Sequence, residues 1–282
     1  MLTLENRELR IELLDPVADA ARQGTRYCWG GYIWQVHDQK SGPLVSGPEW
    51  PEAKPTGFNG QGLPESFRHR SRDGRPLTWR GREGIGIGIG ILAVDEAGNV
   101  TLAEPCQWTI ATQPGRMIFR TAQSAAGFSY ELTRTIELAD RTVRSINEVT
   151  SRGEAPFEMQ WFAHPFFALG TDALGLRAEL PAGAAIPENP GFATVNGVLT
   201  YKRRFVGGDD GQFVIMSVRP HQALHAVVRG AGIPSVDFET NFAPDECPVW
   251  GNRATFSIEP YRKLTLAPQQ SLNWKTVYRF GG

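Results

Sequence analysis

Short runs of alternating apolar and polar residues, separated by turn residues at regular intervals, most constrain what this chain can fold into. Turns spaced about 8–12 residues apart are typical of an all-β sandwich. No helical period persists beyond a turn or two. We therefore predict an all-β protein. Its expected strands are residues 107–112, 116–122, 128–137, 142–150, 157–161, 212–218, 223–228, 235–240, 254–260 and 271–280.

The remaining segments predict less regular structure. Residues 2–14 alternate loosely and indicate a first strand, and residues 24–36 indicate two strands that meet at Gly30-Gly31. Residues 41–62 and 170–197 are rich in Gly and Pro or Ala and are interpreted as loops. No repeat or linker divides the chain, so we expect one domain over residues 1–282.

Glycines alternate with isoleucines over residues 84–90 and superficially resemble a dinucleotide-binding loop. That motif requires a helix after the glycines. Residues 91–102 instead predict a strand, a hairpin turn and a second strand. We expect the glycines to share one strand face, with a ring or backbone close against them.

Composition excludes several functions. The 29 Lys and Arg residues balance the 30 Asp and Glu residues among 282, which argues against nucleic acid or a membrane surface as partner. No signal-peptide pattern and no apolar run of about 18 residues occurs, so a cytoplasmic protein is expected. The three cysteines are widely spaced without a C-x-x-C pair that would indicate a zinc or redox site, so we expect free buried thiols and no metal.

His164 is the first candidate catalytic residue. It lies in residues 160–167, among aromatic and apolar side chains. Burial lowers the pKa of an imidazole and a nearby carboxylate raises it, so the pKa of His164 is expected near neutrality, where proton transfer is efficient. The alternative interpretation is a hydrogen-bonded core histidine.

Glu259 is the second candidate. Phe256 and Ile258 alternate with Ser257 and Glu259, so the Glu259 carboxylate is predicted to face away from the apolar side of a strand that ends at Pro260. Such a carboxylate can point into a cavity. A salt bridge at the rim is the alternative role.

Together these segments resemble the aldose 1-epimerase, or galactose mutarotase-like, family. The resemblance rests on residues 145–150, 160–167, 256–260, 266–274 and 277–280, and more loosely on residues 239–241. It implies a β-supersandwich and a cofactor-free interconversion of the α and β anomers of a free aldose. By position, His164 is implied to be the general acid that protonates the ring oxygen, and Glu259 the general base that takes the proton of the anomeric hydroxyl.

Seven other residues are predicted to bind the sugar. The family carries a histidine in a His-Gly-Gly-type segment where this chain has residues 59–65 without one, although His69 follows. Asp210 is matched loosely to a sugar-contacting aspartate of the family, and Asn241 to a polar strand that lines its sugar site. The predicted substrate-binding residues are Asn59, Gln61, Glu65, Arg82, Trp161, Asp210 and Asn241.

Two alternative functions remain open. The six arginines between Arg68 and Arg82 are interpreted as a solvated face, but they would favour a hexose-6-phosphate 1-epimerase if several guanidiniums converged on one pocket. A non-catalytic carbohydrate-binding or sugar-sensing module on the same fold is the other. Catalysis is favoured if His164 and Glu259 face each other across a pocket one sugar ring wide. A salt bridge or core packing of either favours the binding module. We expect a sugar as the only small-molecule partner, and a monomer or homodimer.

Overall fold

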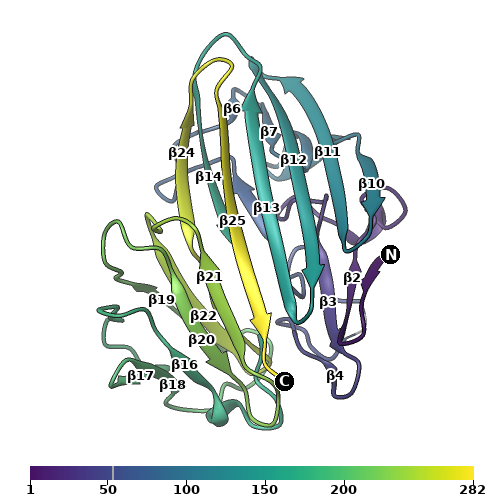
Figure 1. Ribbon diagram of the computed structural model, residues 1–282. Coiled ribbons are helices and arrows are strands. Elements are labelled where there is room, and N and C mark those ends of the chain that lie inside the picture. The colour runs from purple at the N-terminus through teal and green to yellow at the C-terminus, as the bar shows by residue number, and fades with distance from the viewer. Residues whose placement is uncertain (53) are drawn as a thin grey trace.

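The computed structural model describes residues 1–52 and 54–282, and these are nearly all in β-strands, turns and loops (Figure 1). Within these ranges the helices are two single 3₁₀ turns, η1 (Ala20–Arg22) and η2 (Ala173–Gly175). Over the same residues, none of the helices could span a membrane. The predicted all-β class is confirmed.

A ten-stranded antiparallel sheet forms one layer of the molecule. Figure 1 shows its long central strands β12, β13 and β25 side by side. In spatial order the strands are β10 (Thr109–Gln113), β11 (Arg116–Ala125), β12 (Phe128–Ala139), β13 (Thr142–Ser151), β25 (Ser271–Phe280), β21 (Val236–Thr240), β20 (His225–Arg229), β16 (Arg177–Glu179), β18 (Val198–Tyr201) and β17 (Phe192–Val195).

Alternation of side chains gives this sheet one buried face. In β12 every second side chain from Phe128 to Leu138 is buried, whereas the residues between them are at least partly exposed. Because successive side chains of a strand point to opposite faces, this pattern places one face of the sheet against a core.

Four smaller sheets form the second layer. The first contains β1 (Leu2–Glu5), β2 (Leu9–Leu13), β3 (Ile33–Asp38) and β4 (Gly42–Pro43). The second contains β24 (Tyr261–Leu266), β14 (Phe157–Ala163) and β5 (Glu65–Arg68). The third contains β15 (Phe167–Ala168), β23 (Thr255–Ile258), β22 (Cys247–Asn252) and β19 (Gly211–Met216). The fourth contains β6 (Trp79–Arg80), β7 (Glu83–Gly86), β8 (Gly90–Val94) and β9 (Val100–Pro105).

Aromatic side chains join the two layers. The rings of Trp161 on β14 and Trp274 on β25 are 5.5 Å apart between centroids, and those of Phe167 on β15 and Phe238 on β21 are 5.8 Å apart. One cluster of buried apolar side chains extends from Leu4 to Phe280. The core therefore lies between the ten-stranded sheet and the smaller sheets.

A buried ion pair crosses this core. Glu65 on β5 accepts from the Arg134 guanidinium on β12 at 2.7 Å, and both side chains are 1% exposed. Asn147 and the Trp161 indole also donate to the Glu65 carboxylate, at 2.9 Å and 3.0 Å. Arg134 donates further to the Gly30 carbonyl oxygen at 2.6 Å. With these partners the two buried charges are well satisfied.

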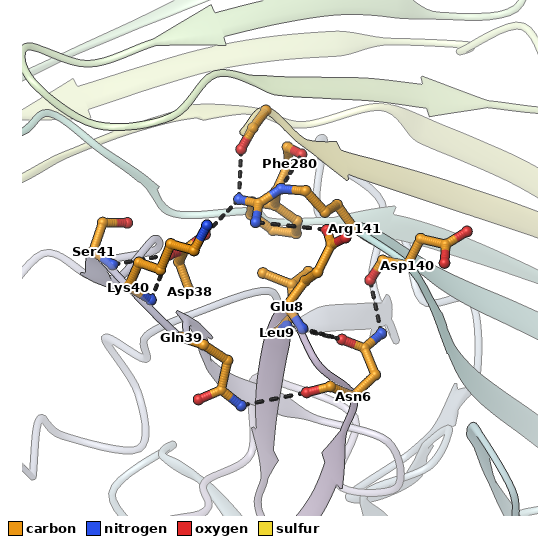
Figure 2. Close-up of polar contacts among 11 residues, drawn as sticks. Asn6, Glu8, Leu9, Asp38, Gln39, Lys40, Ser41, Asp140, Arg141 and Phe280 are labelled. Atoms are coloured by element: carbon orange, nitrogen blue, oxygen red, sulfur yellow. Dashed lines mark hydrogen bonds and ion pairs between the residues drawn. The ribbon is translucent and has the colours of Figure 1, made fainter.

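A second polar cluster ties the β1–β4 sheet to the ten-stranded sheet (Figure 2). Arg141, which follows β12, pairs with Asp38 at the end of β3 at 2.6 Å and donates to the Phe280 carbonyl oxygen at 3.0 Å. Asn6 donates to the Asp140 carbonyl oxygen at 2.8 Å. Burial raises the pKa of the Asp38 carboxyl, but the backbone N–H groups of Ser41 and Lys40, together with Arg141, outweigh it and lower that pKa to about 2.

No helix follows the glycines in the described residues 91–105, as predicted. The glycine-isoleucine segment is not the single strand that was expected, because it turns at residues 87–89 and forms the β7–β8 hairpin. A Cβ atom added at Gly84 would lie 2.0 Å from the Trp79 ring, and one added at Gly90 would lie 2.1 Å from a backbone oxygen. Rings and backbone therefore lie against the glycines. Ile85, Ile87 and Ile89 are buried in the core.

Three further predictions of local structure are wrong. Residues 2–14 form two strands, β1 and β2, rather than one. Residues 24–32 contain no strand, and only β3 follows the Gly30-Gly31 bend. The segment interpreted as loops over residues 170–197 contains β16 and β17, because pairing with β18 and β20 stabilises them despite their Gly, Pro and Ala content. The three cysteines are free and buried, as expected.

Candidate functional site

Strand alternation decides which side chains reach the outer face of the second layer. In the β24-β14-β5 sheet, Ser66 lies opposite Phe162, and Phe162 lies opposite Tyr261. The residues between them, including Trp161, point into the core instead. Tyr261 and Phe162 stack with ring centroids 4.4 Å apart and planes only 4° from parallel. Their facing sides cover each other, and the stacked pair forms an aromatic wall on the outer face.

A cavity of about 1070 Å³ opens over this face. Its lining includes both predicted catalytic residues, His164 and Glu259, although they are only 3% and 5% exposed. Phe162, Tyr261 and Trp250 supply aromatic walls. Aromatic rings with a few polar groups are typical of sugar and other small-molecule sites.

His164 and Glu259 touch at the base of this cavity. The Nε2 atom of His164 lies 3.4 Å from the Oε1 atom of Glu259. The expectation that the two side chains face each other across a sugar ring is therefore wrong. They converge from distant parts of the sequence, as predicted, but they lie beside each other. The backbone N–H of Glu259 is fixed at 2.8 Å from the Pro248 carbonyl oxygen, and that of His164 at 2.9 Å from the Pro64 carbonyl oxygen.

Aromatic rings enclose the imidazole of His164. The ring of Phe166 is 4.4 Å away between centroids, and those of Tyr27 and Trp250 are 6.0 Å and 6.3 Å away. Burial lowers the pKa of His164 well below its ordinary value, and the charge of Arg26 adds to that effect. The expectation of a pKa near neutrality is wrong, because burial dominates and the neighbouring carboxyl is itself held neutral.

Burial has the opposite consequence for Glu259. It raises the pKa of the Glu259 carboxyl to about 8, although the positive charges of Arg26, Arg72 and Arg68 oppose the shift. A desolvated carboxyl favours its neutral form, and so does a desolvated imidazole. At neutral pH the pair therefore consists of a carboxylic acid and an uncharged imidazole in contact.

Ser257 fixes the other side of the imidazole. Its Oγ atom lies 3.2 Å from Nδ1 of His164. All of the side chains from Phe256 to Glu259 are buried, but Ser257 and Glu259 both contact His164, which places them on one face of the chain. Ser257 was not among the predicted site residues. Its position two residues before Glu259 was the signal that could have identified it.

One of the seven predicted substrate-binding residues lines the cavity. Asn59 does so, and its amide donates to Glu49 at 2.8 Å. Glu65 and Trp161 lie on the core side of their strands and bond each other there, so their predicted contact with substrate is corrected. The alternation of β5 and β14 causes this, because their neighbours Ser66 and Phe162 take the cavity face.

The other four predicted residues also lie outside the cavity lining, among the residues described. Gln61 is 3% exposed and donates to the Trp34 carbonyl oxygen at 3.3 Å. Arg82 donates to the carbonyl oxygens of Val94 and Asp95 across the β7–β8 hairpin. Asp210 is held by Arg203, and Asn241 accepts from the Lys275 N–H at the β21–β25 edge. Each side chain is occupied by a local contact that the sequence alone did not indicate.

The predicted solvated arginine face is only partly correct. Arg68, Arg70 and Arg72 line the cavity together with Arg26 and Arg253. Arg75, Arg80 and Arg82 from the same run do not belong to that lining among the described residues. His69, which the sequence places near the missing family histidine, also lines the cavity. Burial and the charges of Arg70 and Arg68 lower its pKa to about 4.

One group of side chains elsewhere has metal-ligand spacing. The ligand atoms of His225, Asp237 and Glu239 lie within 4.8 Å of one another. Arg279 pairs with Asp237 at 3.6 Å and with Glu239 at 2.8 Å. This guanidinium already supplies the positive charge that a cation would bring.

The fold has known counterparts. No protein-family model and no curated protein sequence matches the chain. A galactose mutarotase related enzyme from Lactobacillus acidophilus superposes with a TM-score of 0.66 at 12% identity, covering 100% of this chain and 97% of its own. A galactose mutarotase-like protein from Lactobacillus casei gives 0.61 at 14% identity, with 99% of each chain covered.

This chain has the galactose mutarotase-like fold. A third such protein, from Clostridium acetobutylicum, superposes with a TM-score of 0.59 at 12% identity over 99% of this chain and 93% of its own. The mutarotase-like fold agrees with the predicted supersandwich and extends over essentially the whole chain. At such identities the likeness establishes the fold, and the chemistry has to be argued from the site.

Proposed function

We propose that this protein is an aldose 1-epimerase-like isomerase that interconverts the α and β anomers of an aldose. The observation that carries the proposal is that one aromatic cavity is lined by a group that can donate a proton at neutral pH, Glu259, and by one that can accept a proton, His164. Ring opening requires an acid within reach of the ring oxygen of the sugar and a base within reach of its anomeric hydroxyl. The presence of a named galactose mutarotase related enzyme among proteins of this fold supports the same reaction class.

The protonation states suggest how the pair divides the work. Glu259 holds a proton at neutral pH and His164 has a free nitrogen lone pair, since burial favours both neutral forms. Glu259 then protonates the ring oxygen as its bond to the anomeric carbon breaks, and His164 takes the proton of the anomeric hydroxyl as the carbonyl forms. The open aldehyde faces a carboxylate and an imidazolium, which attract each other. These roles are the reverse of those implied by the family resemblance.

The contact distance suits this chemistry. The ring oxygen and the anomeric oxygen are bonded to the same carbon, so a donor and an acceptor that lie side by side can serve both from one edge of the sugar. After rotation about the C1–C2 bond, the two proton transfers reverse and close the ring on the other face. The stacked rings of Phe162 and Tyr261 line the cavity and offer apolar contact to the sugar.

A non-catalytic sugar-binding module is the second candidate. The direct contact of His164 with Glu259 favours it, because a pair that is closed on itself has its proton donor and acceptor already matched. In this alternative the cavity binds the sugar and the rate of anomer exchange stays that of the free sugar in water.

A panel of aldoses separates the two candidates. Anomeric exchange is followed by NMR for each sugar with and without the protein, and binding is measured on the same samples by titration calorimetry. Accelerated exchange for a sugar that binds is the expected result. Binding without acceleration for every bound sugar identifies the binding module and contradicts the isomerase.

A further inference from the structure

Two guanidiniums converge beside the catalytic pair. The guanidinium carbons of Arg68 and Arg72 lie 5.8 Å and 6.0 Å from the centroid of the Tyr261 ring. Tyr261 is two residues from Glu259 and lines the same cavity. The charges of both arginines, and that of Arg26, act on the Glu259 carboxyl, which places all three near the reacting groups.

Most of these arginines have no carboxylate partner. Within residues 1–52 and 54–282, no ion pair engages Arg26, Arg68, Arg70 or Arg253, although all four line the cavity. Arg72 pairs with Glu246. Guanidiniums gathered in one cavity without carboxylate partners concentrate positive charge there, and their paired N–H groups match the oxygens of a phosphate or a carboxylate, so the cavity is suited to an external anion.

The lining carries three acidic residues besides Glu259 against five arginines, so its carboxylates offset only part of this positive charge. Glu49 is occupied by the Thr56 N–H and the Asn59 amide, at 2.6 Å and 2.8 Å. Glu52 and Asp209 are exposed to solvent. Glu259 is neutral at pH 7 because burial raises its pKa to about 8. Burial lowers the pKa of His69, and the positive charges of Arg70 and Arg68 lower it further. The second effect is the one that positive charge in the cavity produces on an imidazole.

We propose that the sugar bound in this cavity carries an oxyanion substituent, a phosphate or a carboxylate, held by the guanidiniums of Arg68 and Arg72 beside Tyr261. This inference rests on the proposed function for the sugar itself and adds the class of substrate. A guanidinium donates two parallel N–H groups to such an oxyanion, which fixes orientation as well as charge. The anion would thereby hold the anomeric carbon over His164 and Glu259.

The test measures binding separately from turnover. Glucose, glucose 6-phosphate and glucuronate are titrated calorimetrically into the full chain and into its Arg68→Gln and Arg72→Gln variants. Arg80→Gln is the matched control, because Arg80 belongs to the same basic run but lies over the Phe128 ring at 4.9 Å, away from the cavity. Thermal melts confirm that each variant is folded. Anomeric exchange of the three sugars is measured in parallel.

The expected result is that at least one charged sugar binds more tightly than glucose. Arg68→Gln and Arg72→Gln each weaken that binding by roughly 10- to 100-fold, the size of one charge-assisted hydrogen bond, and leave glucose binding unchanged. Arg80→Gln leaves the binding of all three sugars unchanged. Comparison of glucose 6-phosphate with glucuronate shows which oxyanion the site prefers. This pattern supports the anion site even if exchange is not accelerated, a result that would contradict only the isomerase.

The inference is overturned if glucose binds as tightly as both charged sugars and the two arginine variants leave all three affinities unchanged. Accelerated exchange of glucose in that case would leave the proposed isomerase intact. The two proposals therefore fail on different measurements.

Discussion

The Nε2 atom of His164 lies 3.4 Å from the Oε1 atom of Glu259, and both side chains are almost excluded from solvent while they line the same cavity. Burial shifts their pKa values in opposite directions, down for His164 and up for Glu259. The pair thus combines a proton donor and a proton acceptor at neutral pH without either group being charged. Proton transfer to and from a sugar would convert it into an ion pair.

The first prediction concerns the pH dependence of catalysis. Because Glu259 must hold its proton, kcat/KM for the best aldose should fall as pH rises through about 8. On the acidic side it should not fall near the ordinary histidine pKa, since the pKa of His164 lies well below it. Initial rates of anomeric exchange across this range test both limbs. A rate that increases through pH 8 would show that the ionised carboxylate is the active form.

The second prediction concerns stability. The folded pKa of Glu259, about 8, exceeds the ordinary value of 4.5, so between these values the folded state retains a proton that the unfolded state has lost. Stability attributable to this group therefore declines as pH rises through that window, by about 1.4 kcal/mol per pH unit at most.

Glu259→Gln removes this titration. As pH rises from 4.5 toward 8, the parent protein should lose stability that Glu259→Gln does not lose. The free energy of unfolding of the variant, measured with urea, should therefore increase relative to that of the parent. Exposed Glu158→Gln serves as the control. Parallel curves for the parent and Glu259→Gln would mean that Glu259 ionises normally.

The third prediction assigns a positioning role to Ser257. Its hydroxyl meets Nδ1 of His164 at 3.2 Å and holds the imidazole with Nε2 toward Glu259. Ser257→Ala should lower kcat by about 5- to 10-fold, the value of one neutral hydrogen bond, while KM stays unchanged. Ser257→Thr keeps the hydroxyl and should restore kcat. Equal losses in both variants would instead indicate a packing defect.

The fourth prediction tests the buried ion pair. Arg134→Met leaves the Glu65 carboxylate without its positive partner in the core and should reduce the free energy of unfolding by about 3–5 kcal/mol. The double variant with Glu65→Leu should recover part of that loss, because no charge remains buried. Arg75→Met, which breaks the exposed pair with Glu158, should have no measurable effect. Additive losses in the double variant would contradict strong coupling.

Much of the fold could be predicted from strand periodicity. The strand from Ser271 to Phe280 has the predicted bounds, and β11, β12 and β13 begin at the predicted residues. Alternation is informative there because one face is buried and the other is not. The strands β16 and β17 were missed because their short segments are surrounded by Gly and Pro, and only pairing with β18 and β20 makes them strands.

The candidate site was predictable where alternation could be followed and not where a side chain has a partner distant in the sequence. Glu259 and Ser257 take the face opposite Ile258, as the pattern predicts. The same rule, applied to β14, assigns Phe162 to the face of His164 and Trp161 to the core. The partners of Glu65 and Asp210 lie on other elements or beyond a loop, so no local pattern indicated that they were already occupied.

Anomeric exchange in Glu259→Gln tests the central claim most directly. The substitution keeps the shape of the side chain and removes its exchangeable acid proton. Saturation-transfer NMR on the aldose that exchanges fastest with the parent protein should show the rate in the folded variant falling to that of the free sugar. Exchange in Glu259→Gln at the parent rate would contradict proton transfer by the His164–Glu259 pair.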